Sequence, residues 1–171
     1  MEARSALYNQ LILEHNKKPR NYGKLEAPTH QSEGLNPLCG DHIWLTAEVE
    51  GGVLARIGFE GQSCAICQAS ASIMTTQVKG KPVAQVEALI QDFRHVVTGQ
   101  PEAVSADNRE NRYFGAFSGI ATLPARVKCA VLPWHTLHAA LGGEAASSTE
   151  GAADPIPGSG LAAGSQGPAH P

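Results

Sequence analysis

The 171-residue sequence has little of several features that mark common protein classes. It has no large excess of either charge, because 13 lysines and arginines stand against 16 acidic residues. A nucleic-acid binder that depends on phosphate attraction is therefore not expected. No apolar run approaches the roughly 20 residues of a membrane helix, and the amino-terminal residues lack the apolar core of a secretory signal. We expect a cytoplasmic protein with no nucleic-acid partner and no membrane contact.

Cysteine is also scarce, since four residues are too few for a small domain built on disulfides. In a chain without an export signal, such cysteines are better interpreted as free thiols or metal ligands. They are Cys39, Cys64, Cys67 and Cys129. An inert buried thiol is the alternative for each. That alternative suits Cys67, which lies among alanines and serines, better than Cys39, which lies in a turn.

The last thirty residues, 142–171, have almost no large apolar side chains. Twenty-two of them are glycine, alanine, serine or proline, and the only larger aliphatic residues are Ile156 and Leu161. Such a segment cannot bury enough apolar surface to offset its ordering entropy. It holds three acidic residues and no lysine or arginine, which leaves 13 charges of each sign in the rest. We predict a folded domain over 1–141 and a disordered acidic tail over 142–171.

The pattern of residues within 1–141 predicts an antiparallel hairpin. Apolar and polar residues alternate over about 42–50 and again over 53–60. Gly51-Gly52 between them suits a two-residue turn, because both positions tolerate positive φ. Residues 24–41 are predicted as loop with a short strand.

Helical spacing of apolar residues dominates the remainder of the domain. It predicts helices over about 5–17, 65–79, 83–98 and 124–141. The segment 102–118 is predicted to be irregular, and Pro133 should kink or break the last helix. Because strands and helices are segregated, we predict an α+β fold of two layers. In it a small antiparallel sheet, the hairpin plus a third strand, packs against helices.

Three of the cysteines occupy positions that this fold brings together. Cys39 lies in a turn directly before the first hairpin strand, and Cys64 follows the second strand at a helix start. Antiparallel pairing places these two positions at the same end of the sheet. A helix start favours a thiolate at Cys64, and Cys129, near the start of the last helix, can close the site. Three thiolates and one further ligand suit zinc or iron–sulfur chemistry.

The identity of the fourth ligand stays open on spacing alone. Asp41 lies two residues after Cys39, so both side chains point the same way in an extended segment. Cys67 forms a C-x-x-C pair with Cys64, and residues three apart share a helix face. Spacing alone supports Asp41 and Cys67 about equally as the fourth ligand. Asp41 is otherwise an ordinary turn residue, and nearby histidines are weaker candidates.

Four motifs, in order, resemble a known family. They are Leu7-Tyr8 with Asn16–Gly23, Asn36–Asp41, Cys64–Ser72 and Arg126–Trp134. Together they resemble the U-type iron–sulfur cluster assembly proteins, SufU and IscU, which share the NifU amino-terminal domain. The resemblance covers nearly all of residues 5–141, and the tail has no counterpart in it.

The resemblance implies metal ligands at Cys39, Asp41, Cys64 and Cys129, with Cys67 outside the ligand set. Lys128 stands where IscU has a histidine, and 65 positions separate Cys64 from Cys129, which is more than in IscU. Both departures favour the SufU branch. The implied protein is a zinc-bound sulfur acceptor, or zinc-dependent sulfurtransferase, for a SufS-type cysteine desulfurase. Cys39 is then the sulfur acceptor.

Other interpretations remain beside this one. The same four residues suit a scaffold that assembles a 2Fe–2S cluster, with iron or a transient cluster as cofactor, and passes it to apo-proteins. A purely structural zinc domain is a further alternative. A dithiol redox protein is disfavoured, because the C-x-x-C pair follows a hairpin and not a βαβ unit.

Arg126 and Lys128, otherwise solvated helix charges, would keep the site electropositive. Downstream SUF components and apo iron–sulfur proteins are the implied further partners.

Overall fold

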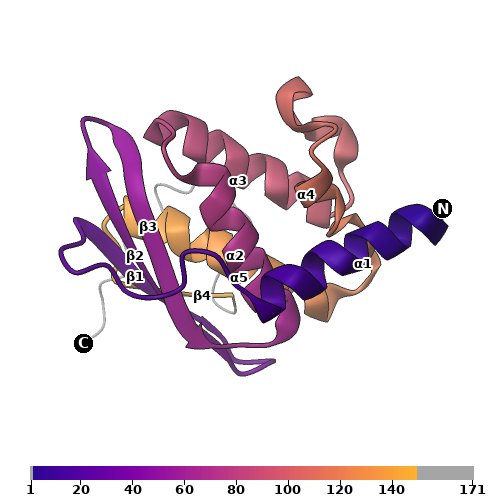
Figure 1. Ribbon diagram of the computed structural model, residues 1–171, viewed down its shortest axis with the longest axis horizontal. Helices are drawn as coiled ribbons and strands as arrows, with labels where there is room; N and C mark the ends of the chain where they lie inside the picture. Colours follow the sequence, from indigo (N-terminus) through magenta and orange to yellow (C-terminus); the bar gives the residue numbers. More distant parts are fainter. Residues whose placement is uncertain (1, 150–171) are drawn as a thin grey trace.

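The computed structural model describes residues 2–149, with side chains described from Gln10 onward. The helices are α1 (Glu2–Lys17), α2 (Ala65–Val78), α3 (Val83–Val97), α4 (Arg112–Gly115) and α5 (Pro124–Leu141). The strands are β1 (His30–Asn36), β2 (Asp41–Glu50), β3 (Val53–Gln62) and β4 (Ala146–Ser148). The sheet forms one layer and the helices pack beside it (Figure 1). The predicted α+β class is confirmed.

The sheet has the order β3-β2-β1-β4. The predicted hairpin is confirmed as β2 and β3, and its turn residues Gly51 and Gly52 have φ of 57° and 78°. The short strand predicted within 24–41 is confirmed as the seven-residue strand β1, which pairs antiparallel with β2 as the predicted third strand. The predicted sheet was wholly antiparallel, whereas β4 pairs parallel with β1.

The helices cover one face of the sheet. Along β2 the side chains of Ile43 and Leu45 are buried, whereas those of His42 and Trp44 point to the opposite, accessible face. This alternation is the period of two that a strand with one covered face requires. His42 and Trp44 stack on each other at a centroid separation of 4.0 Å, and His42 also pairs with Glu33 of β1.

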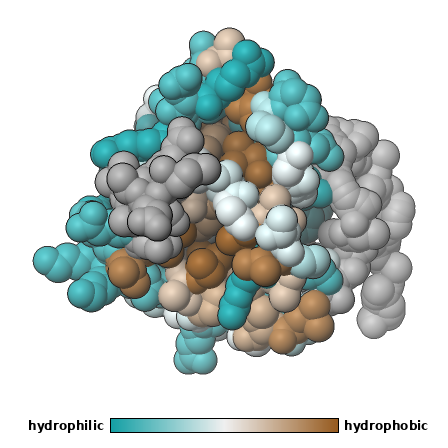
Figure 2. Space-filling view, turned by 90° about the vertical axis from the view of Figure 1, so that its right-hand side faces the viewer, coloured by the Kyte–Doolittle hydropathy of each residue, from teal (hydrophilic) through white to brown (hydrophobic). Residues whose placement is uncertain are grey.

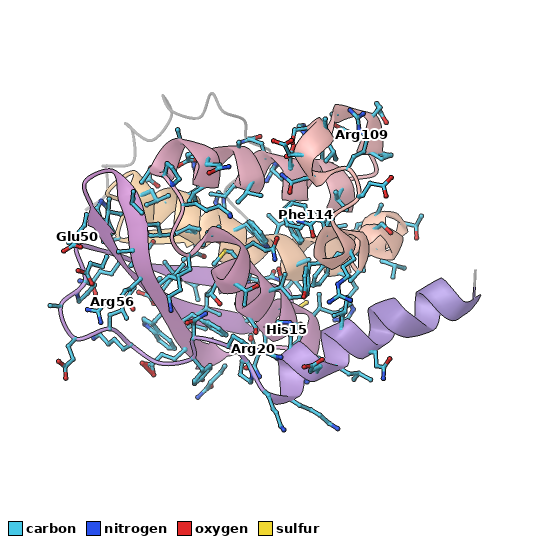
Figure 3. The ribbon with its side chains drawn as sticks, turned by 45° about the horizontal axis from the view of Figure 1, so that its top comes forward. His15, Arg20, Glu50, Arg56, Arg109 and Phe114 are labelled. Atoms are coloured by element: carbon cyan, nitrogen blue, oxygen red, sulfur yellow. The ribbon has the colours of Figure 1, made fainter. Side chains whose placement is uncertain are left out.

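Aromatic side chains fill the space between the helices. The rings of Phe93 and Trp134 stack 4.4 Å apart, and Phe114 meets both edge-on. Figure 3 labels Phe114 among the helices. The indole N–H of Trp134 donates to Ser70 on α2, so its polar atom is satisfied in the core. This packing explains why α5 continues through Pro133, so the break that was one of the two predicted effects of this proline does not occur. A proline removes one backbone hydrogen bond, and the surrounding contacts hold the helix together.

Helix α5 lies directly on the backbone of β1 at Gly34. A Cβ atom at this position would lie 2.0 Å from Oγ1 of Thr136 and 3.2 Å from Cδ1 of Leu132. Since real Cβ contacts are never so short, the absence of a side chain at Gly34 sets the distance between α5 and the sheet.

Helix α1 is fastened to α2 by a buried polar cluster. The backbone N–H of Arg20 donates to Oγ of Ser72, and the Ser72 hydroxyl is also hydrogen-bonded to Nδ1 of His15 at 2.7 Å. Burial lowers the pKa of His15, which favours the neutral ring. Figure 3 shows His15 and Arg20 side by side where α1 ends.

The segment predicted to be irregular, 102–118, contains short helical turns as well as α4. The buried carboxylate of Asp92 on α3 accepts hydrogen bonds from the backbone and hydroxyl of Ser105 and from Asn108. These bonds explain why the segment is ordered although it has no long apolar pattern. A single buried carboxylate accepts hydrogen bonds from several of its short turns.

The boundary predicted at 141/142 also needs correction. Residues 146–148 form β4, so the ordered domain continues to Thr149. Backbone pairing with β1 supplies this order, and it does not require apolar side chains. The remainder of the predicted tail, 150–171, lies outside the described residues.

In the part of the chain that the structure describes, no helix is long and apolar enough to span a bilayer. Seen from the side where α1 begins, hydrophobic side chains gather towards the middle of the surface and hydrophilic ones surround them (Figure 2).

Two leucines on α1 test this packing. Leu11 is 8% exposed and belongs to the core, whereas Leu13 is 57% exposed. Leu11→Ala should lower the free energy of unfolding by about 2–5 kcal/mol. Leu13→Ala should change it by no more than about 0.5 kcal/mol. Urea denaturation followed by circular dichroism measures both, and equal losses would contradict the described orientation of α1.

Candidate metal centre

The candidate site lies at one end of the sheet, where three segments meet. The turn 37–40 joins β1 to β2 and carries Cys39. Cys64 is the N-cap of α2, two residues after the end of β3. Cys129 lies near the start of α5, which packs against both β1 and α2. The predicted convergence of Cys39 and Cys64 at one sheet end is confirmed by the pairing of His42 with Gln62.

Cys39, Asp41 and Cys129 form a compact group of metal-ligating atoms. Their ligand atoms all lie within 4.8 Å of one another. The sulfurs of Cys39 and Cys129 are 3.2 Å apart, and both thiols are free. Asp41 and Cys129 are buried, whereas Cys39 is exposed. Two donors are therefore fixed inside the domain and one lies at its surface.

Cys64 joins this group through the carboxylate of Asp41. Its backbone N–H donates to Oδ1 of Asp41 at 2.7 Å, and its sulfur lies 3.9 Å from Oδ2. The free N–H groups at a helix start favour a carboxylate in this place. Asp41 is only 1% exposed. The structure thus groups the ligand atoms of Cys39, Asp41 and Cys129, and it places Cys64 beside Asp41, with its sulfur outside that group of three.

The electrostatics of the group disfavour several negative charges in the absence of a cation. Burial, a hydrogen bond with Cys39 and the nearby charge of Cys64 raise the pKa of the Cys129 thiol well above its usual range. Several thiolates and a carboxylate cannot share this small space without a compensating positive charge. Three sulfurs and one carboxylate oxygen are a donor set that suits zinc.

Arg126 lies next to Cys129, and its predicted role in keeping the site electropositive stays a prediction. Its side chain is exposed, and the pKa of its guanidinium is raised by a hydrogen bond to Cys129 and by the charges of Cys129 and Cys64. Lys128 is half-buried on the same turn of α5. Its predicted contribution to the site stays a prediction.

Cys67 has a different environment from the other thiols. It is fully buried and packs in a small apolar cluster with Ile43, Cys129 and Leu132. Burial and the nearby charge of Asp41 raise the pKa of its thiol well above the usual range. Its sulfur lies outside the group formed by the ligand atoms of Cys39, Asp41 and Cys129.

Sequence reasoning assigned no role to Asn36, which the structure places beside the group. Its side-chain Nδ2 donates to Oδ2 of Asp41 at 3.3 Å and to the sulfur of Cys129 at 3.6 Å. Asn36 is fully buried. The only signal in the sequence is the Asn-Pro pair, which is typical of turns and does not indicate contact with the site.

Comparison with known proteins decides the family. The family described as the NifU-like N-terminal domain matches residues 7–130, which is more than half of the chain. The protein belongs to this family. The match ends before β4, so the last described strand lies outside the segment that defines the domain.

The relatives of this NifU-like domain carry two kinds of description. The zinc-dependent sulfurtransferase SufU of Bacillus subtilis is 37% identical over 131 residues, which cover 77% of this chain and 86% of the relative. The iron–sulfur cluster assembly scaffold protein IscU of Thermotoga maritima is also 37% identical, over 79% of this chain and 92% of the relative. Overall identity therefore does not separate the two descriptions.

Solved structures agree with the fold. A candidate iron–sulfur cluster assembly scaffold protein of the SUF system from Fervidobacterium islandicum superimposes with a TM-score of 0.71 and 31% identity. The superposition covers 77% of this chain and 94% of that protein. A NifU-like N-terminal domain from Brucella abortus has a TM-score of 0.69 at 23% identity, over 80% and 92% of the two chains, and supports the fold alone.

Two serine substitutions test which thiols belong to the site. Cys67→Ser should leave the zinc content of the purified protein unchanged, because its sulfur lies outside the group of Cys39, Asp41 and Cys129 and it does not cap α2 beside Asp41 as Cys64 does. Cys64→Ser should lower it strongly, because one sulfur donor is lost. Elemental analysis after exhaustive dialysis against a weak chelator measures both. Loss of zinc from Cys67→Ser alone would place Cys67 in the ligand set instead.

Proposed function

We propose that the protein serves iron–sulfur cluster assembly as a zinc-bound sulfur acceptor for a cysteine desulfurase. The observation that carries this proposal is the convergence of one exposed thiol with two further thiols and a buried carboxylate. The description of the Bacillus subtilis relative as a zinc-dependent sulfurtransferase supports it. The proposed ligands are Cys39, Asp41, Cys64 and Cys129.

These residues fit zinc in number, type and surroundings. When bound, zinc keeps its thiolate ligands deprotonated at neutral pH and does not itself change oxidation state. Asp41 is oriented for this task, because its Oδ1 accepts from the α2 N-terminus and its Oδ2 accepts from Asn36. Such outer hydrogen bonds fix the direction of a ligand and increase metal affinity.

Cys39 is the residue best placed to accept sulfur. It is the exposed member of the group, and its turn contains Gly40 at φ 72°. Cys129 is buried in α5, and Cys64 is the half-buried cap of α2. A partner can therefore reach the Cys39 sulfur more readily than the other two.

The transfer itself is a thiol–disulfide exchange. The Cys39 thiolate attacks the outer sulfur of a persulfide on the desulfurase cysteine. A new S–S bond forms to Cys39, the S–S bond to the desulfurase cysteine breaks, and that cysteine leaves as a thiolate. No outside oxidant or reductant is needed, because the sulfur carries its oxidation state with it. Arg126 and Lys128 favour the anionic thiolate and persulfide.

The surface around Cys39 suits docking of a protein partner. Leu38 precedes Cys39 and is 63% exposed. Exposed apolar side chains beside a reactive thiol favour contact with another protein. We assign a SufS-type desulfurase as this partner, and downstream SUF components and apo iron–sulfur proteins as recipients. Four free thiols fit a reducing compartment, so we assign the protein to the cytoplasm.

A scaffold role is the second candidate, supported by the IscU description of the Thermotoga maritima relative. The same four donors would then hold a 2Fe–2S cluster before its transfer. Lys128 stands where IscU proteins have a histidine, which favours the sulfur acceptor. A purely structural zinc domain would hold zinc on these residues and never carry persulfide.

Substitution of Cys39 tests the acceptor role. Cys39→Ala should abolish stimulation of alanine release by a SufS-type desulfurase and should prevent persulfide loading of this protein. Cys67→Ala is the matched control and should retain both. Persulfide is located by alkylation and mass spectrometry. Undiminished stimulation and loading of Cys39→Ala would refute the acceptor role.

Anaerobic reconstitution separates the two candidate functions. Protein incubated with ferrous iron and sulfide should develop little stable visible absorbance if it is a sulfur acceptor. Stable absorbance of a 2Fe–2S cluster, lost in Cys39→Ala, would favour the scaffold. Zinc binding with neither persulfide nor cluster would leave the structural zinc domain.

A further inference from the structure

The short strand β4 connects the end of the described chain to the metal centre. It pairs in parallel with β1, so that Ala146, Ser147 and Ser148 lie opposite Glu33, Gly34 and Leu35. The carbonyl of Ala145 accepts from the N–H of Glu33 at 2.9 Å, and the N–H of Thr149 donates to the carbonyl of Leu35 at 3.0 Å. These bonds reach Leu35, the residue before Asn36, with which β1 ends.

Thr149 contacts Asn36 through its side chain. Its hydroxyl Oγ1 donates to Oδ1 of Asn36 at 3.1 Å. An asparagine side chain has one acceptor end and one donor end, and Thr149 occupies the acceptor end. The donor end of Asn36 must therefore face the opposite way.

That donor end faces two of the proposed metal ligands. Nδ2 lies 3.3 Å from Oδ2 of Asp41 and 3.6 Å from the sulfur of Cys129. Both partners are acceptors, and the NH₂ group has one hydrogen for each. If the amide turned over, its oxygen would face the carboxylate and the sulfur, and these buried acceptors would lose the hydrogen bonds that Nδ2 donates.

We propose that Asn36 is a positioning residue for Asp41 and Cys129, and that Thr149 of the C-terminal segment sets its orientation. This inference rests on the proposed zinc site. The residue that follows β4, a strand outside the segment that defines the family, thereby helps to position the ligands of the metal centre. Outer hydrogen bonds of this kind typically change metal affinity by about 10–100-fold.

The arrangement makes metal affinity sensitive to the state of β4. The strand has three residues, Ala146 is exposed, and the other two are half-buried. A short strand on a sheet edge opens locally at lower free energy than the core does. Opening of β4 withdraws Thr149 from Asn36, and zinc binding in turn favours the closed form by linkage.

Point variants in the full chain test this inference. Thr149→Val keeps the branched shape and removes the hydroxyl, so it should raise the zinc dissociation constant on the order of tenfold. Thr149→Ser keeps the hydroxyl and should retain most of the affinity. Ser147→Ala is the control within the same strand, because its buried hydroxyl has no hydrogen-bond partner among the described residues. It should leave the affinity unchanged.

Two measurements separate positioning of the ligands from general support of the fold. Competition with a chromogenic chelator gives the zinc affinity, and thermal unfolding of the metal-free protein gives the stability without metal. The d–d absorption of the cobalt-substituted protein reports the ligand geometry. Thr149→Val should change the affinity and the cobalt spectrum while the metal-free midpoint stays close to that of Ser147→Ala. Asn36→Ala should shift the spectrum in the same direction and lose more affinity.

Each possible result either supports or overturns the positioning role of Asn36 and Thr149. A wild-type protein that binds no zinc overturns the proposed function and this inference together. A wild-type protein that binds zinc, with Thr149→Val binding it equally well, overturns this inference alone. A loss of affinity in Thr149→Val that equals the loss in Thr149→Ser, or that merely follows a lower metal-free midpoint, also refutes the positioning role.

Discussion

The carboxylate of Asp41 is the point at which the separate parts of the site are joined. It is buried, and its two oxygens accept from different segments, Oδ1 from the start of α2 and Oδ2 from the end of β1. A buried carboxylate without such partners would be strongly unfavourable, so the fold must keep these donors in place. The same bonds bring the cap of α2 to the turn that carries Cys39.

The site consequently combines a rigid part with an accessible one. Asp41 and Cys129 are buried in regular elements, whereas Cys39 lies in an exposed four-residue turn. This difference suits a centre that must retain its metal and also offer one sulfur to a partner. It is compatible with both descriptions found among the relatives, because either function needs one donor that can be reached from outside.

Much of the fold and of the site could be predicted from local pattern. Strand alternation and the Gly51-Gly52 turn fixed the hairpin, and the hairpin placed Cys39 and Cys64 at one sheet end. The pattern could not reveal β4, because its order comes from backbone pairing with β1 and not from apolar side chains. It could not reveal Asn36 either, since the bonds of Asn36 to Cys129 and Thr149 link positions far apart in the chain.

The close approach of α5 to β1 at Gly34 has a consequence for the size of what the site can hold. Because the helix backs directly onto the strand, Cys129 cannot retreat inward, and outward movement of α5 would uncover the packed core around Trp134. A single ion and a two-iron cluster differ in the span that their ligands must bridge. An increase in the distances between the ligand atoms therefore has to come from movement of the turn that carries Cys39. The conformation of this turn then determines whether a single ion or a two-iron cluster fits.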